Sequence, residues 1–124
     1  MRLKQSRIEN YFWKPRIIRK DKEGSSCEEY GAAVSFRGES WPVSGKTQAE
    51  KYGQRLPYVR NLKIEGRYIA KADDKGRMHY DFGGGFDVRE LDGICIYAEA
   101  GQKPDYKIIS IKAYRTLTLE VEHI

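Results

Sequence analysis

The sequence predicts a mainly β protein: a small antiparallel β-barrel, or a sandwich, of about six to eight short strands with long loops and one short helix. Short apolar and aromatic stretches alternate with polar positions in a period of two, as half-buried strands do. Turn-forming Gly, Asp and Ser residues separate these stretches, and only one segment has helical character. The length of 124 residues is that of one domain with a modest core. We expect residues 1–15 to form a basic N-terminal arm and residues 16–124 to form the β-barrel domain.

Two strands are predicted in the first third of the chain. Residues 11–20 are aromatic and β-branched, but Pro15 interrupts them, so the strand itself is expected over residues 16–20. A turn cluster, DKEGSS, follows this strand. Residues 29–43 form the second predicted strand, because apolar side chains there recur at every other position. Gly38 within this segment predicts a β-bulge.

The one predicted helix covers residues 46–54 and follows a turn at residues 44–45. Thr47 fits the N-cap, and Glu50 stands three residues later, which is the spacing of a capping box. Gly53 fits the C-cap. The GKT triplet at the start of this helix resembles a phosphate-binding loop, but the glycine that such a loop requires five residues earlier is Ser40 here. A nucleotide site is therefore not expected.

The second half of the chain contains hairpin and turn signals. Residues 58–72 alternate as a strand does, and a DDKG turn leads to a predicted hairpin partner over residues 77–82. The triple glycine at residues 83–85 predicts the mobile tip of a loop. A tight Asp92-Gly93 turn introduces the next strand.

The clearest strand signal is near the C-terminus, over residues 116–122 and after a further strand at residues 106–114. Leu117, Leu119 and Val121 point to one face, which we expect to be the core. The opposite face carries a polar set: Thr116, Thr118, Glu120 and Glu122.

No combination of residues predicts catalysis, a metal site or a cofactor. His79 and His123 have no metal-ligand spacing, and Cys27 and Cys95 form no CxxC pair. Two reduced thiols are expected, with a disulfide between these cysteines as the alternative. The aspartates of the loops do not fit an EF-hand: Asp73, Asp74, Asp81 and Asp87. We therefore expect neither an enzyme nor a small-molecule substrate. No apolar run is long enough to span a membrane, and the N-terminus lacks the features of a signal peptide, which predicts synthesis in the cytoplasm.

The positive charge is concentrated at the N-terminus. The net charge of the chain is +5, and residues 1–22 contribute eight basic against two acidic residues. Such asymmetry indicates a polyanion or an acidic protein surface as a neighbour, or a solvated arm. The basic arm residues considered for this contact are the following: Arg2, Lys4, Arg7, Lys14, Arg16, Arg19 and Lys20.

Several fragments, in this order, resemble the head-tail connector proteins of tailed bacteriophages and prophages, the small adaptor or stopper (head-completion) family. They are KEGSSCEEYG leading into AVSFRGESWPVSGKTQAEKYG, then DGICIYAE, then KPDYKIISIKAYRTLTLEVE. The resemblance covers about residues 15–124 and consists of strand patterns and turns rather than catalytic residues. The basic N-terminus and the segment DDKGRMHYDFGGGFD are longer than that family leads us to expect.

The resemblance implies a small β-barrel that assembles as a ring under the portal, joins the DNA-filled head to the tail and helps to retain the genome. Its partners would be copies of itself, the portal or an adaptor on the head side and tail proteins on the other, with non-specific contact to packaged DNA. It would be located in the virion. The residues considered for ring or partner contacts are these: Trp41, Ser44, Gly45, Lys46, Tyr52, Gly83, Gly84 and Gly85.

The alternative function is a small β-barrel that binds nucleic acid through the basic arm and exposed tyrosines. Nine of the residues are tyrosine, and bases stack on aromatic rings. The same residue types are also enriched at protein interfaces and in cores. No RRM or OB-fold signature decides between these interpretations.

Overall fold

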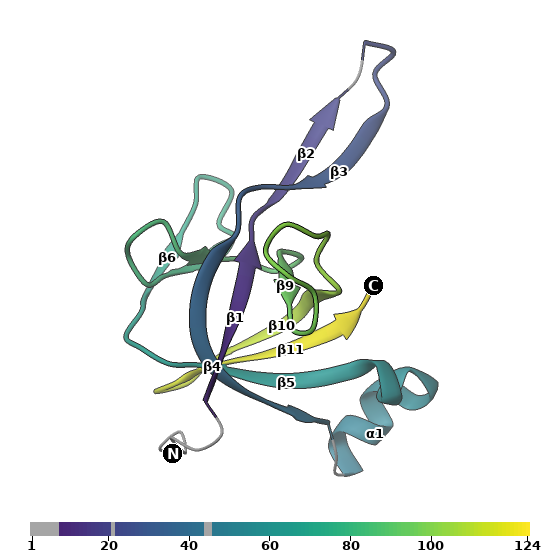
Figure 1. Cartoon of the computed structure of the whole chain (residues 1–124), viewed down its shortest axis with the longest axis vertical. Helices are drawn as coiled ribbons and strands as arrows, with labels where there is room; N and C mark the ends of the chain where they lie inside the picture. Colours follow the sequence, from purple (N-terminus) through teal and green to yellow (C-terminus); the bar gives the residue numbers. More distant parts are fainter. Residues whose placement is uncertain (1–7, 21, 44–45) are drawn as a thin grey trace.

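The computed structural model describes residues 8–20, 22–43 and 46–124, and six antiparallel strands close a barrel within them (Figure 1). The order around the barrel is β1-β4-β5-β11-β10-β9. The strand bounds are β1 Glu9–Lys14, β4 Val34–Pro42, β5 Val59–Ile64, β9 Gly93–Cys95, β10 Tyr106–Ala113 and β11 Leu117–His123. The predicted mainly β class with one short helix is confirmed, and the architecture is the barrel rather than the sandwich.

Alternate residues of the barrel strands fill its interior. Leu117, Leu119 and Val121 are fully buried, which confirms the core face predicted for the last strand. Aromatic rings fill the core on the side of the small three-stranded sheet that is described below. Phe86 stacks on Phe36 at a centroid distance of 5.1 Å and lies 5.4 Å from the ring of Trp13. These rings and the buried aliphatic side chains form one hydrophobic cluster inside the barrel, as is usual for a barrel with so few strands.

Two small sheets are attached to the barrel. β2 (Arg16–Lys20) and β3 (Ser26–Tyr30) form a hairpin that projects away from it (Figure 1). β6 (Ile69–Ala72), β7 (Met78–Asp81) and β8 (Asp87–Val88) form a three-stranded sheet on one side. The strand expected over residues 16–20 is found, and β6 pairs with β7 as a hairpin. The single strands expected over residues 29–43 and 58–72 are wrong, because each is divided between two sheets. The chain breaks between β3 and β4 at residues 31–33, and between β5 and β6 near Gly66, which has φ 118°.

The barrel begins before residue 16, where the sequence predicted the boundary between a basic arm and the barrel domain. Tyr11 and Trp13 lie in β1 and are 4% exposed, so residues 9–14 are part of the barrel wall and not of an arm. Pro15 interrupts pairing as expected, but it lies between two strands, where the chain leaves the barrel and enters the hairpin. Arg2, Lys4 and Arg7 of the expected arm lie outside the described residues.

The bulge expected at Gly38 is absent. β4 pairs in unbroken register on both sides there, with Gly38 opposite Glu9 and Ile64. The glycine is required for a different reason: a Cβ atom at this position would lie 2.3 Å from the backbone oxygen of Lys63. The register shift of the barrel occurs instead in β10, between Ile108 and Ser110.

A helical connection joins β4 to β5 and covers one side of the barrel (Figure 1). α1 (Lys46–Tyr52) begins one residue before the expected N-cap, and Gly53, at φ 53°, ends it. A 3-10 helix, η2 (Gly53–Tyr58), continues the connection. The expected turn at residues 44–45 and the side chain of Thr47 lie outside the described part of the chain. No helix among the described residues is long and apolar enough to cross a bilayer.

The triple glycine forms the turn between β7 and β8. All three glycines have positive φ values, and the backbone N–H of Phe82 donates to the carbonyl of Phe86 across the turn. The carboxylate of Asp81 accepts a hydrogen bond from the N–H of Gly83 at 2.8 Å. Glycine is therefore needed here for its backbone conformation. The mobility expected of this loop stays a prediction.

Candidate interaction surfaces

The projecting hairpin has one basic and one acidic strand. β2 supplies Arg16 and Arg19, and β3 supplies Glu28 and Glu29. Arg16 Nε lies 2.8 Å from Glu28 Oε2, and Arg19 Nε lies 2.6 Å from Glu29 Oε2. The hydroxyl of Tyr30 donates to Glu28, and this bond together with Arg16 lowers the pKa of Glu28. The outer edges of both strands are unpaired, because β2 and β3 form a sheet of two strands only.

Two of the four described members of the basic set near the N-terminus form ion pairs within the hairpin. Arg16 and Arg19 are paired with glutamates, and Lys14 donates from its ammonium group to the carbonyl of Gln102. Lys20, which is exposed at the end of β2, is the fourth described member of the basic set. Within the described residues, the arginines of β2 are therefore balanced by the glutamates of β3, which reduces the attraction of the hairpin for a polyanion.

Asp92 fixes the base of the hairpin to the barrel. Its carboxylate is 3% exposed and accepts three hydrogen bonds of 2.9 Å, from Trp13 Nε1 and from the backbone N–H groups of Arg16 and Arg89. Burial raises the pKa of Asp92, and these hydrogen bonds oppose the rise. The sequence indicated only a turn at this position, since the donors are up to 79 residues away along the chain.

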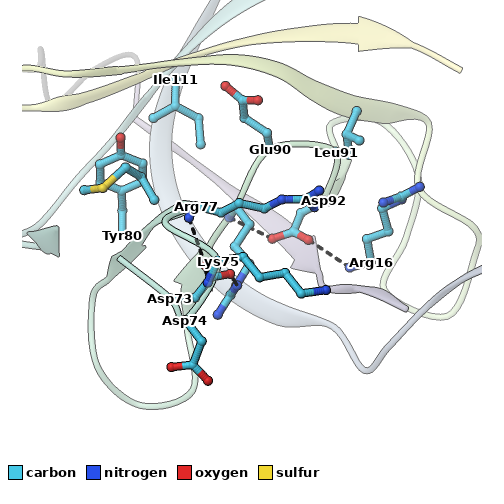
Figure 2. Close-up of a pocket in the computed structure, with 12 residues that line it drawn as sticks. Arg16, Asp73, Asp74, Lys75, Arg77, Tyr80, Glu90, Leu91, Asp92 and Ile111 are labelled. Carbon is cyan, nitrogen blue, oxygen red and sulfur yellow. Dashed lines mark hydrogen bonds and ion pairs between the residues drawn. The ribbon is translucent and has the colours of Figure 1, made fainter. Parts of the chain in front are cut away.

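A cleft of about 810 Å³ lies beside Asp92 (Figure 2). Its walls come from the turn after β6, from β7, from the turn before β9 and from β10. Leu91, Met78 and Ile111 give it apolar lining, and Met78 and Leu91 are 47% and 40% exposed. Lys75 and Arg77 bring basic groups to the same cleft. None of these residues was identified from the sequence, because the cleft exists only once the second sheet packs beside the barrel.

The loop aspartates organise turns. Oδ1 of Asp73 accepts the backbone N–H groups of Lys75 and Arg77, and its Oδ2 lies 3.3 Å from Arg89 Nη1. These backbone hydrogen bonds lower the pKa of Asp73. Asp87 is 2.8 Å from Nδ1 of His79. No group of three or more His, Cys, Asp or Glu side chains that could hold a metal is found in the described ranges.

The two cysteines lie in different environments. Cys27 is exposed on β3, whereas Cys95 is buried in β9, and both thiols are free. Burial raises the pKa of the Cys95 thiol, which makes the reactive thiolate less accessible there.

The helical connection is held to the barrel by a buried carboxylate. Glu120 of β11 is 1% exposed, although the sequence placed it on the polar face. Gln48 Nε2 donates to it at 3.0 Å, and Lys51 Nζ and Lys112 Nζ lie 3.4 Å and 3.7 Å from its Oε1. Burial raises the pKa of Glu120, but the hydrogen bond from Gln48 and the two ammonium groups help to outweigh it, so that the pKa is lowered. The sequence predicted the alternation of β11 correctly, but it did not predict that α1 covers the polar face of this strand.

The residues expected to make partner contacts are not brought together. Tyr52 is 7% exposed and packs with Val43 and Val59, so its ring contacts the barrel. Trp41 is half-buried in β4 with Lys63 Nζ 5.3 Å from its ring centroid. The glycines at residues 83–85 form the turn between β7 and β8, in the small sheet on the other side of the barrel from α1 (Figure 1). Ser44, Gly45 and the side chain of Lys46 lie outside the described residues.

Comparisons with models of protein families, with curated proteins and with solved structures found no match to this chain.

Proposed function

We propose that this chain is a head-tail connector, an adaptor or stopper, of a tailed bacteriophage or prophage, and that it forms a ring between the portal and the tail. The observation that carries the proposal is a closed barrel with a projecting hairpin whose two free edges have opposite charge. The resemblance of residues 15–124 to the connector family is independent support. The ring would help to retain packaged DNA.

The charges of the hairpin favour contact between unlike edges of neighbouring copies. Pairing β2 with β2 would bring two basic strands together, and pairing β3 with β3 would bring two acidic strands together. Pairing the β3 edge of one copy with the β2 edge of the next places opposite charges side by side. Such head-to-tail contacts repeat around an axis and form a ring when the rotation between copies closes. They would also extend a hairpin that is marginal as an isolated two-stranded sheet.

The other partners would be the portal or an adaptor on the head side and tail proteins on the opposite side. The chain would be made in the bacterial cytoplasm and incorporated into the virion. We propose no reaction, cofactor or small-molecule substrate for it. The alternative, a nucleic-acid-binding barrel, is less favoured because Arg16 and Arg19 are already paired with glutamates.

Reconstitution on phage heads tests the proposal. DNA-filled heads that carry the portal but lack this chain would be prepared from the phage that encodes it, and purified chain would be added. We expect electron microscopy to show a ring below the portal and the heads to release less DNA. Arg19→Glu is expected to abolish both effects, and the double change Arg19→Glu with Glu29→Arg to restore them.

Arg115→Glu, an exposed charge reversal on the turn after β10, is the matched control and should behave as the unchanged chain does. A chain that leaves the heads unchanged but binds single-stranded DNA below about 1 μM at physiological salt would support the alternative instead. In the proposed connector, DNA binding is weak and decreases as salt rises.

A further inference from the structure

We infer that the cleft beside Leu91 binds an extended segment of a partner protein in which a carboxylate side chain adjoins a bulky apolar one. The hairpin contributes to this surface only at its base, where Arg16 of β2 lines the cleft. The inference does not depend on ring formation, because it rests on the cleft residues alone.

The backbone conformation of Leu91 is the first observation. Leu91 has φ 72°, and it is the one non-glycine residue with positive φ among those described. The fold imposes this angle, since the N–H of Leu91 donates to the carbonyl of Ile108 at 2.7 Å and the N–H of Ile108 donates to the carbonyl of Asp92. Glycine or asparagine would adopt it with less strain. A leucine there, two-fifths exposed, is explained if its side chain contacts a partner.

The apolar lining is the second observation. Met78 is 47% exposed and Ile111 is half-buried, and both line the same cleft as Leu91. Exposed apolar side chains that share a concave surface are typical of binding sites. The volume of about 810 Å³ suits a few residues of extended chain with one large apolar side chain.

The charges of the cleft give the third observation. Asp73 and Asp92 are occupied by hydrogen bonds within the chain, and Arg89 is paired with Asp73. Lys75 and Arg77 make no side-chain hydrogen bond or ion pair within the described ranges, and they line the cleft. These two cations complement a carboxylate beside the apolar group of the ligand.

The remaining acids make a polyanion a poor occupant. Glu90 also lines the cleft, beside Leu91 and Ile111 in Figure 2, and would repel a phosphate backbone. Asp74 points away from Arg77 and Asp92 in the same view. A peptide with an isolated carboxylate brings one negative charge to Lys75 and Arg77 and offers backbone N–H groups to Glu90, whereas a nucleic acid brings a negative charge with every nucleotide.

A titration with defined peptides tests the inference. The probe is the capped peptide Ser-Ser-Asp-Leu-Ser-Ser, with one control in which Asn replaces Asp and another in which Ser replaces Leu. We expect the probe to shift the amide resonances of residues 73–77 and 89–92 in the isotope-labelled chain, and each control to bind at least about tenfold more weakly. Arg77→Glu should weaken the probe to a similar extent. Shifts elsewhere, equal binding of the controls or stronger binding of an oligothymidine would overturn the inference.

The variant Leu91→Gly distinguishes a role of Leu91 in binding a partner from a role in packing the fold. The glycine removes the strain and the apolar side chain together, so we expect an unchanged or higher melting temperature and at least about tenfold weaker binding of the probe. Leu91→Asn should give the same pattern. Tyr114→Ser, which removes an exposed ring outside the cleft lining, should leave the affinity unchanged. A lower melting temperature for Leu91→Gly would show that Leu91 is a packing residue and would contradict the inference.

Discussion

The carboxylate of Asp92 connects three parts of the molecule that are far apart in sequence. It accepts hydrogen bonds from Trp13 in the barrel wall, from Arg16 at the base of the hairpin and from Arg89 at the edge of the cleft. Without this acceptor, the N–H group of Trp13 would be buried and unsatisfied, and the two partly buried backbone N–H groups would lose their partner. The position of the hairpin relative to the cleft therefore depends on one side chain.

Asp92→Asn should destabilise the protein by roughly 2–4 kcal/mol, because an amide replaces an ionised acceptor and directs N–H groups toward N–H donors. Urea unfolding monitored by tryptophan fluorescence would measure the change. Asp74→Asn, on an exposed turn, is the control and should remain within about 0.5 kcal/mol of the original chain. Equal stability of the two variants would show that the three hydrogen bonds contribute little.

Glu120 should make the docking of α1 sensitive to acid. Its pKa in the folded chain is lowered from the usual 4.5, so its stabilising contribution is complete above about pH 4.5 and is lost as the pH falls through the folded pKa. Glu120→Gln should therefore melt at a lower temperature than the original chain at pH 7. The difference should shrink below pH 4.5, as differential scanning calorimetry across that range would show. A difference that grows with acid would contradict the assigned direction.

Single residues also show where sequence-based prediction stops. The alternation of β11 was sufficient to place Leu117, Leu119 and Val121 in the core, because a period of two is a local property. The same alternation put Glu120 on the opposite face but could not show that α1 covers that face. The role of Asp92 could not be predicted from the sequence for a similar reason, since only the closed barrel brings its hydrogen-bond partners close to it.

Among the elements, β11 is a fully paired barrel strand, with β5 on one side and β10 on the other. Leu119→Asp should unfold the domain, since an unpaired charge at a fully buried position costs several kcal/mol. Ala113→Asp, at the exposed end of β10, is the matched control and should cost about 1 kcal/mol or less. Circular dichroism of both purified variants would give the comparison, and a Leu119→Asp protein that melts like the original would refute the barrel assignment.

The elements differ in how far the sequence predicted them. The strand at residues 16–20 and its turn were found, because the pattern of a hairpin is local. That this hairpin lies outside the barrel was not predicted, and β1 was assigned to an arm, because Pro15 breaks pairing equally well at the end of a strand and between two strands. Gly38 was interpreted as a bulge, whereas the close approach of β5 requires the glycine.

At the scale of the whole molecule, the barrel and the hairpin should be separable. Replacing residues 18–28 by Asn-Gly would join Ile17 to Glu29 through a two-residue turn and keep the N–H of Arg16 on Asp92. We expect the melting temperature to remain within about 3 °C, since the removed side chains are largely exposed, whereas ring formation on phage heads should be lost. Rings formed by the shortened chain would contradict a role for the hairpin edges in assembly.

The strand order also determines when the fold can form during synthesis. β1, β4 and β5 are neighbours in space and emerge early, so they can pair as a three-stranded sheet while the ribosome is still translating. The circle closes only after β9 reaches β1, some 80 residues later, and after β11 fills the gap between β5 and β10. Until then the nascent chain exposes two open sheet edges and the apolar face of β5, the state in which such chains aggregate. Pairing over such distances is slow, so chaperone capacity is expected to limit the yield of this protein.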